Sequence, residues 1–215
     1  MAYEFNGTNQ SILATTAPAT GEPLTIAAWF YPDSATTRTA IVSLAANALT
    51  GDFFALVQDG TKVGDPICAT KYSGGSDAGE AVSSTGYTTG AWNHGAAVFA
   101  SNTSRTIYLN GGGKVENTTL RGSATGISRT AVGALARSTI SAFFDGRVAE
   151  AGIWTATLND DEIAALAKGV SPRFIRPQSL VFYAPLIRDL NDIRGSLSLT
   201  NNNSATVATH PRAYL

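Results

Sequence analysis

Short runs of strand-forming residues, each ended by turn residues, are the feature that most limits the folds open to this chain. Residues 24–31 are rich in β-branched and aromatic side chains and stop at Pro32-Asp33. Residues 53–57 form a similar run that ends near Asp59-Gly60, where glycine reaches a positive φ without steric cost. Many short strands spaced by about 8–12 residues predict an antiparallel β-sandwich or barrel.

A β-hairpin is predicted around residue 110. Residues 96–100 and 106–109 read as two strands joined by a short loop. Asn110-Gly111 is a turn dipeptide, and it sends the chain back toward Lys114-Val115.

One short helix is predicted over residues 159–168. Asn159 or Asp160 can cap its first turn, acidic residues follow in that turn, and Gly169 ends it. The acidic group Asp160-Asp161-Glu162 is therefore interpreted as the start of a helix rather than as a metal or acid–base site.

Composition favours one folded domain that does not bind nucleic acid or enter a membrane. The chain has 215 residues, 44% of them hydrophobic and 14% charged, with a formal net charge of −1. No basic run is present to neutralise phosphates, and no apolar stretch approaches the roughly 18 residues of a membrane span. We expect residues 1–215 to form a single domain, with residues 170–215 closing the same sandwich.

Cys68 is the single cysteine, so no intrachain disulfide and no multi-cysteine zinc site is possible. We interpret it as a small buried residue rather than a reactive thiol. The first residues lack a basic segment followed by an apolar one, so no secretory signal is expected and the chain is predicted to be made in the cytoplasm.

Three segments share an order and spacing with a known family. Phe5-Asn6-Gly7 precedes a strand with a tryptophan; Trp92-Asn93-His94 precedes Tyr108-Leu109-Asn110-Gly111; and residues 144–154 precede the helix. Together they resemble the laminin-G-like or concanavalin-A-like jelly-roll family over roughly residues 3–170. The resemblance implies an antiparallel β-sandwich of the concanavalin-A-like type.

The tail extends this resemblance to a narrower group. Residues 169–186 and the ending around His210-Pro211-Arg212 resemble the tails of laminin-G-like proteins that tailed bacteriophages encode. That likeness implies a virion location and partners among capsid or tail proteins, in a symmetric homo-oligomer.

The three tryptophans lie in strand-like runs and are predicted to anchor the core: Trp29, Trp92 and Trp154. His94 is interpreted as a structural hydrogen-bonding residue rather than a catalytic base.

Signatures of catalysis are missing from the sequence. Retaining glycosidases need two carboxylates about 5–5.5 Å apart, and on such a sandwich they project from one strand. Asp145 and Glu150 are five residues apart and would point to opposite faces of a regular strand. There is also no Gly-x-Ser-x-Gly elbow, phosphate loop or histidine-rich motif. We therefore predict that the chain is not an enzyme and needs no cofactor.

Many members of the resembled family bind calcium through aspartates. By position those aspartates fall at Asn6, Gln10 and Ala149, none of which is acidic. We therefore predict no family-type metal site.

The longest interval of low hydrophobicity, residues 71–90, is predicted to be an exposed loop or hairpin. It carries the candidate ligand-binding residues: Tyr72 and Tyr87, which could stack on sugar rings, and Asp77, which could accept hydroxyl hydrogen bonds.

Three functions remain open from the sequence. The first is a non-enzymatic virion protein, a head-decoration or tail-associated module with host glycans as a further contact. The second is a stand-alone carbohydrate-binding module, and the third is a glycoside hydrolase or lyase.

Overall fold

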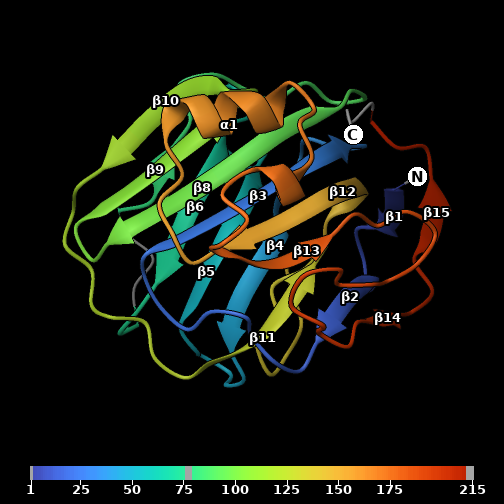
Figure 1. Ribbon diagram of the computed structural model, residues 1–215, viewed down its shortest axis with the longest axis horizontal. Coiled ribbons are helices and arrows are strands. Elements are labelled where there is room, and N and C mark those ends of the chain that lie inside the picture. Colours follow the sequence, from blue (N-terminus) through green and yellow to red (C-terminus); the bar gives the residue numbers. More distant parts are fainter. Residues whose placement is uncertain (1, 76–78, 212–215) are drawn as a thin grey trace.

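Two antiparallel sheets face each other in the computed structural model, which describes residues 2–75 and 79–211 (Figure 1). The front sheet runs in the order β10-β9-β8-β3-β12-β1-β15, with β13 also paired to β12, and the back sheet runs β14-β2-β11-β4-β5-β6-β7. The predicted all-β sandwich with one short helix is confirmed.

The strands of the front sheet are β1 (Ala2–Asn6), β3 (Leu24–Pro32), β8 (Asn93–Ser101), β9 (Ser104–Leu109), β10 (Gly112–Asn117), β12 (Asp145–Trp154), β13 (Leu180–Ala184) and β15 (Thr206–Ala208). Those of the back sheet are β2 (Ser11–Ala14), β4 (Arg38–Ala46), β5 (Phe53–Asp59), β6 (Ile67–Tyr72), β7 (Ala81–Val82), β11 (Ile127–Val132) and β14 (Thr200–Asn202). The predicted hairpin is confirmed, since β9 pairs with β10 and both turn residues, Asn110 and Gly111, have positive φ.

The main core fills the space between the two sheets. Alternate residues of the central strands enter it, as the two-residue period of a strand requires. Most of its aromatic members are phenylalanines, and Phe54 of the back sheet meets Phe99 of the front sheet edge-on at 5.1 Å between ring centroids. Burial of each such side chain stabilises the fold by about 1.5–3 kcal/mol.

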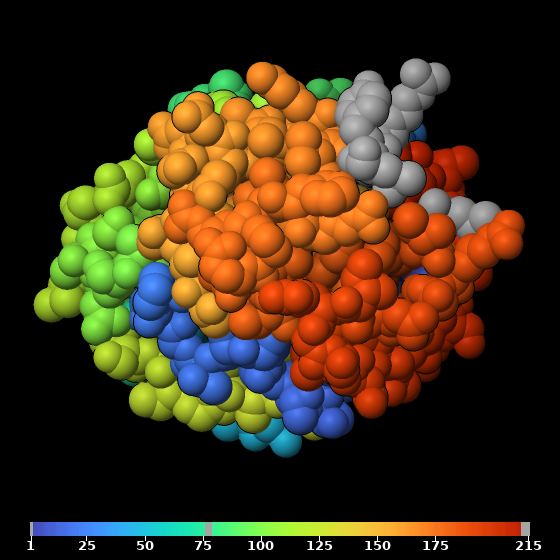
Figure 2. Space-filling view, in the orientation of Figure 1, coloured from blue at the N-terminus to red at the C-terminus, as the bar shows by residue number. Residues whose placement is uncertain are grey.

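The C-terminal segment adds strands to both sheets. β13 pairs with the second half of β12 and β15 pairs with β1, while β14 pairs with β2 in the back sheet. Figure 2 shows that α1 and the residues after it, coloured orange to red, cover much of the viewed face. The outer surface of the front sheet is therefore largely covered by the chain's own C-terminal third.

The helix α1 (Asp160–Ala167) begins and ends as predicted. The side chain of Asn159 accepts a hydrogen bond from the backbone of Glu162, whose side chain accepts one in return from the backbone of Asn159. Ile163 and Leu166 are buried in a second apolar cluster on the outer face of the front sheet, together with Trp154.

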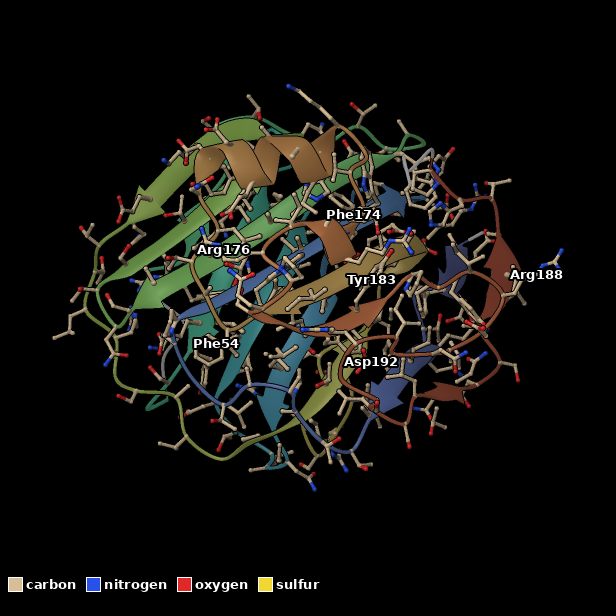
Figure 3. The ribbon with its side chains drawn as sticks, viewed as in Figure 1. Phe54, Phe174, Arg176, Tyr183, Arg188 and Asp192 are labelled. Carbon is tan, nitrogen blue, oxygen red and sulfur yellow. The ribbon has the colours of Figure 1, made fainter. Side chains whose placement is uncertain are left out.

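Polar contacts fasten the segment that follows the helix. A 3-10 turn, η1 (Pro172–Phe174), leads to Ile175, whose carbonyl accepts a 2.8 Å hydrogen bond from the indole nitrogen of Trp154. The hydroxyl of Tyr183, labelled in Figure 3, donates to Glu150 at 2.5 Å. The Nε2 of His210 lies 2.9 Å from the same carboxylate, so residue 210 contacts the middle of β12.

The predicted placement of the tryptophans needs correction. Trp154 is fully buried, but beneath the helix rather than between the sheets. Trp29 and Trp92 are only partly buried. The side chain of Trp29 shares the outer face of the front sheet with Ala27, its neighbour two residues earlier in β3. A strand run in which both faces carry apolar residues does not reveal which face meets the core.

The interpretation of His94 is corrected as well. Its ring packs edge-on against Trp29 at 5.4 Å between centroids, and its buried Nδ1 has no partner among the described residues. Burial lowers the pKa of His94 to about 3, so the ring is neutral near pH 7 and acts as a packing group.

No helix within the described part of the chain is long and apolar enough to cross a bilayer.

Replacing the capping residue should weaken the fold measurably. For Asn159→Ala we expect a loss of about 1 kcal/mol in the free energy of unfolding, because the amide of Glu162 loses its acceptor. Urea denaturation measures this change in the free energy of unfolding. Asn47→Ala, at an exposed loop side chain, serves as the control and should change stability little. Equal stabilities for both variants would contradict the role given to the cap.

Candidate functional site

The outer face of the back sheet is apolar although no second sheet packs on it. In β5 the side chains of Phe53, Ala55 and Val57 lie on this face, and they alternate with Phe54 and Leu56, which enter the main core. Alanines and Cys68 from neighbouring strands complete the cluster. Small residues keep this face flat and leave room for something to lie on it.

A loop between β11 and β12, residues 133–143, crosses this face. Backbone hydrogen bonds hold both of its ends to β4: Gly133 donates to Ile41 and Ala40 donates to Ala142, each at 2.9 Å. Between them, the hydroxyl of Ser43 donates to the carbonyl of Ala134 at 2.8 Å. The loop is thus anchored along β4.

The loop places Arg137 on top of two aromatic rings. The rings of Phe53 and Tyr72, from neighbouring strands, are nearly parallel, with 5.5 Å between centroids and 6° between planes. The guanidinium carbon of Arg137 lies 4.7 Å from the centroid of Phe53 and 4.5 Å from that of Tyr72. Its Nε donates to the carbonyl of Gly51 at 2.8 Å. Cation–π contact and this hydrogen bond together fix the orientation of the guanidinium.

A pocket of about 200 Å³ opens beside this stack. Its walls are mostly apolar, with two guanidinium groups and one phenol: Arg38, Thr39, Ala40, Phe53, Ala55, Val57, Tyr72, Leu135, Arg137 and Ala142. Sites for whole drug-sized ligands span roughly 300–1,000 Å³. This pocket therefore suits one part of a ligand, such as a single ring of a longer chain.

An ion-pair cluster borders the pocket at Arg38. The guanidinium of Arg38 contacts Asp59 at 2.5 Å and Glu80 at 2.6 Å. The ammonium of Lys62 contacts Asp59 at 2.8 Å and Glu80 at 2.5 Å. Thr70 accepts from Arg38 and donates to Glu80. Two cations and two anions leave the cluster without net charge.

The neighbouring cations keep both carboxylates ionised. Burial alone would raise the pKa of Asp59, but hydrogen bonds from Lys62, Thr61 and Arg38 outweigh it and lower the pKa to about 2. The pKa of Glu80 is lowered in the same way, against its own burial, by Arg38 and Lys62. Neither carboxyl can therefore hold a proton near pH 7, as a general acid must.

Asp59, Glu80 and the thiol of Cys68 come close enough to suggest a metal site. Their ligand atoms lie within 4.8 Å of one another. However, Arg38 and Lys62 already occupy the carboxylate oxygens. Burial raises the pKa of Cys68 to about 12, which keeps the thiol protonated. A divalent cation would have to displace the four ion pairs made by these two carboxylates, so we do not interpret the group as a metal centre.

Larger hollows lie elsewhere, and one of about 610 Å³ runs along residues 190–199. That hollow is lined by aliphatic and uncharged polar side chains apart from Asp192, whose carboxylate accepts four backbone hydrogen bonds, from Tyr183, Arg194, Gly195 and Leu197. It lacks an oriented group that could recognise a ligand, which the smaller pocket has.

The sequence-predicted ligand residues do not form one site. Tyr72 lines the pocket, but the guanidinium of Arg137 lies over its ring, so a sugar cannot stack there as predicted. Tyr87 is 6% exposed and belongs to the main core, and the prediction that it binds ligand is wrong. Asp77 lies outside the described residues.

The interval 71–90 is not simply an exposed loop. Lys71 ends inside the sandwich, 2% exposed, where its ammonium contacts Glu22 and Asn102. Residues 81–82 form the edge strand β7. A polar composition alone did not reveal these buried partners.

The positions expected for calcium ligands serve other purposes. The amide oxygen of Asn6 accepts hydrogen bonds from the backbone of Thr8 and Asn9 within its own turn, at 3.0 and 3.1 Å. Gln10 donates to carbonyls of the C-terminal segment, and Ala149 is buried in β12.

Sequence reasoning missed Phe53, Leu135 and Arg137. The alternation of Phe53, Ala55 and Val57 with Phe54 and Leu56 could have indicated a strand that is apolar on both faces. Nothing in the sequence of residues 133–143 indicates that the loop folds back over that strand.

The fold defines the class of this protein: a two-sheet antiparallel β-sandwich of the jelly-roll type, here with a small pocket on the outer face of one sheet. The family described as the concanavalin A-like lectin/glucanases superfamily matches residues 6–164. The chain therefore belongs to this superfamily, as the sequence predicts. No curated protein matches the chain significantly.

Solved structures share the fold at low identity. A heptameric SAP-like pentraxin from Limulus polyphemus has a TM-score of 0.68 and 13% identity, over 95% of this chain and 93% of that one. Domain 4 of AbnA, a GH43 arabinanase from Geobacillus stearothermophilus in complex with arabinotriose, has a TM-score of 0.60 and 19% identity, over 77% and 76%. The CBM40 of the Ruminococcus gnavus IT-sialidase, bound to α2,3-sialyllactose, has a TM-score of 0.53 and 16% identity, over 77% and 96%.

Acid should weaken the fold through Asp59. Its pKa in the folded protein, about 2, lies below its usual value of 3.8. The contribution of Asp59 to the free energy of unfolding is therefore present above about pH 4 and is lost as the pH falls through 2. In Asp59→Asn we expect lower stability at pH 7 and a smaller drop between pH 5 and pH 2.5. Urea unfolding at several pH values measures both.

Asp161→Asn, at an exposed position in the first turn of α1, is the matched control. It should keep the acid sensitivity of the unchanged protein. An unchanged pH profile in Asp59→Asn would contradict the ion-pair account.

Proposed function

We propose that this chain is a carbohydrate-binding module without catalytic activity, and that its ligand occupies the pocket between the 133–143 loop and β5. The observation that carries the proposal is the guanidinium of Arg137 held over the rings of Phe53 and Tyr72 at the edge of a mostly apolar pocket. Sugar sites need flat apolar surfaces for C–H faces and a few fixed polar groups for hydroxyls. Leu135 and Ala142 supply the first, while Tyr72 and Arg137 supply the second.

The electrostatics beside the pocket support binding over hydrolysis. Asp59 and Glu80 approach each other closely enough to resemble the carboxylate pair of a retaining glycosidase. A glycosidase, however, needs one carboxyl with a raised pKa as its acid, and both of these pKa values are lowered. The pair therefore has a structural role at the wall of the pocket.

Structural neighbours support a ligand of this class. The arabinanase domain is in complex with arabinotriose, and the CBM40 is bound to a sialylated sugar. We infer carbohydrate binding for this chain from its own pocket together with these likenesses.

A glycan array with the unchanged protein tests the proposal. Bound glycans should be lost from Leu135→Trp, which fills the pocket, and from Tyr72→Ala, which removes a wall and support for Arg137. Val63→Trp, a fully exposed site elsewhere, is the control and should bind as the unchanged protein does. Binding that survives in Leu135→Trp would show that glycans bind at another surface and not in this pocket. An array with no bound glycan would overturn the proposal.

A second proposal, attachment to a bacteriophage virion, rests on the resemblance of the tail to phage-encoded relatives. It predicts a homo-oligomer that contacts capsid or tail proteins. Mass spectrometry of purified particles tests it, and absence of the chain from them would end it.

A further inference from the structure

The guanidinium of Arg137 has hydrogen-bonding capacity that the protein does not use. Its Nε donates to Gly51, but Nη2 is buried without a partner, and no described residue accepts from Nη1. A guanidinium carries five N–H donors in a planar fork, so four of them remain unmatched. Leaving a charged group partly unsatisfied beside an apolar wall costs free energy unless a ligand completes it.

The charge of Arg137 is also unmatched. Within residues 2–75 and 79–211 no carboxylate forms an ion pair with it, whereas Arg38 on the same pocket is paired with Asp59 and Glu80. The pocket therefore carries about one uncompensated positive charge. Its apolar lining strengthens any charge interaction made there, because the local dielectric is lower than that of water.

The stack beneath Arg137 fixes the direction in which these donors point. Both ring planes of Phe53 and Tyr72 lie under the guanidinium, and the bond from Nε to Gly51 prevents the group from turning about its long axis. The backbone carbonyl of Arg137 is itself held by Arg129 at 2.9 Å. Because Nη2 is buried and Nε is bonded to Gly51, a ligand can reach the N–H groups of Nη1. An ionised carboxylate accepts a stronger hydrogen bond from a charged donor than a neutral hydroxyl does.

We infer that the pocket selects sugars that carry a carboxylate, with Arg137 as the residue that determines this specificity. The inference rests on the proposed carbohydrate-binding function and adds the chemical class of the ligand. A neutral sugar of the same shape would leave the charge of Arg137 unpaired, so discrimination comes from the carboxylate itself.

Matched ligand pairs test the inference by isothermal titration calorimetry. Trigalacturonate is compared with its methyl ester, and 3′-sialyllactose with lactose. We expect at least one acidic member to bind roughly tenfold or more tightly than its uncharged partner. In Arg137→Gln this preference should disappear. Arg137→Lys should keep only part of it, because an ammonium carries the charge but not the fixed orientation of the planar guanidinium.

Arg188→Gln is the control for the loss of one positive charge. Arg188 is exposed, projects from the molecule's edge (Figure 3) and does not line the pocket. It should keep the preference of the unchanged protein. Thermal unfolding of each variant verifies that the fold is intact.

The outcomes separate the inference from the function on which it rests. If array ligands are neutral, or if Arg137→Gln binds acidic and neutral sugars as the unchanged protein does, acidic specificity is overturned while carbohydrate binding stands. If no glycan of either kind binds, both fail. If Arg137→Gln unfolds, Arg137→Lys carries the test. An undiminished acidic preference in Arg137→Lys, or the same loss of preference in Arg188→Gln as in Arg137→Lys, would refute the specific role of the oriented guanidinium.

Discussion

The apolar outer face of the back sheet is the constraint on which the candidate site depends. A sheet of a two-layer sandwich commonly buries one face and exposes the other to water. Here β5 is buried along its whole length, so its outer side chains must be covered by something other than a second sheet. The 133–143 loop does part of this, held to β4 by backbone bonds and by Ser43. The pocket lies where the loop stops covering this face.

Two charged groups border that pocket, and their environments differ. Arg38 has partners for both terminal nitrogens and belongs to a cluster without net charge. Arg137 is held by aromatic faces and one carbonyl, which fix its position without neutralising it. Proteins satisfy most of their buried polar groups, and one that is fixed but unsatisfied next to a hollow is a candidate for ligand recognition. The apolar face thus accounts for the pocket, and the unpaired guanidinium accounts for its chemistry.

Local sequence signals predicted the local structure well. The Asn110-Gly111 turn and the capped helix at Asn159 follow from short-range rules, and both are found. The sandwich itself follows from recurring strands and from the family resemblance. The predictions that failed would have required knowledge of long-range contacts. Tyr87 and Lys71 lie in a polar stretch of sequence, but their burial depends on partners far along the chain. Arg137 reaches β5 and β6 only through the fold of its loop, so no spacing in the sequence could indicate it.

The most direct test of this account is a crystal structure of the protein with trigalacturonate or 3′-sialyllactose bound. The account predicts electron density for the sugar in the pocket beside Leu135, with its carboxylate within hydrogen-bonding distance of Nη1 of Arg137 and that guanidinium still lying over Phe53 and Tyr72. A sugar bound on another surface, or one in the pocket with its carboxylate turned to solvent, would contradict it.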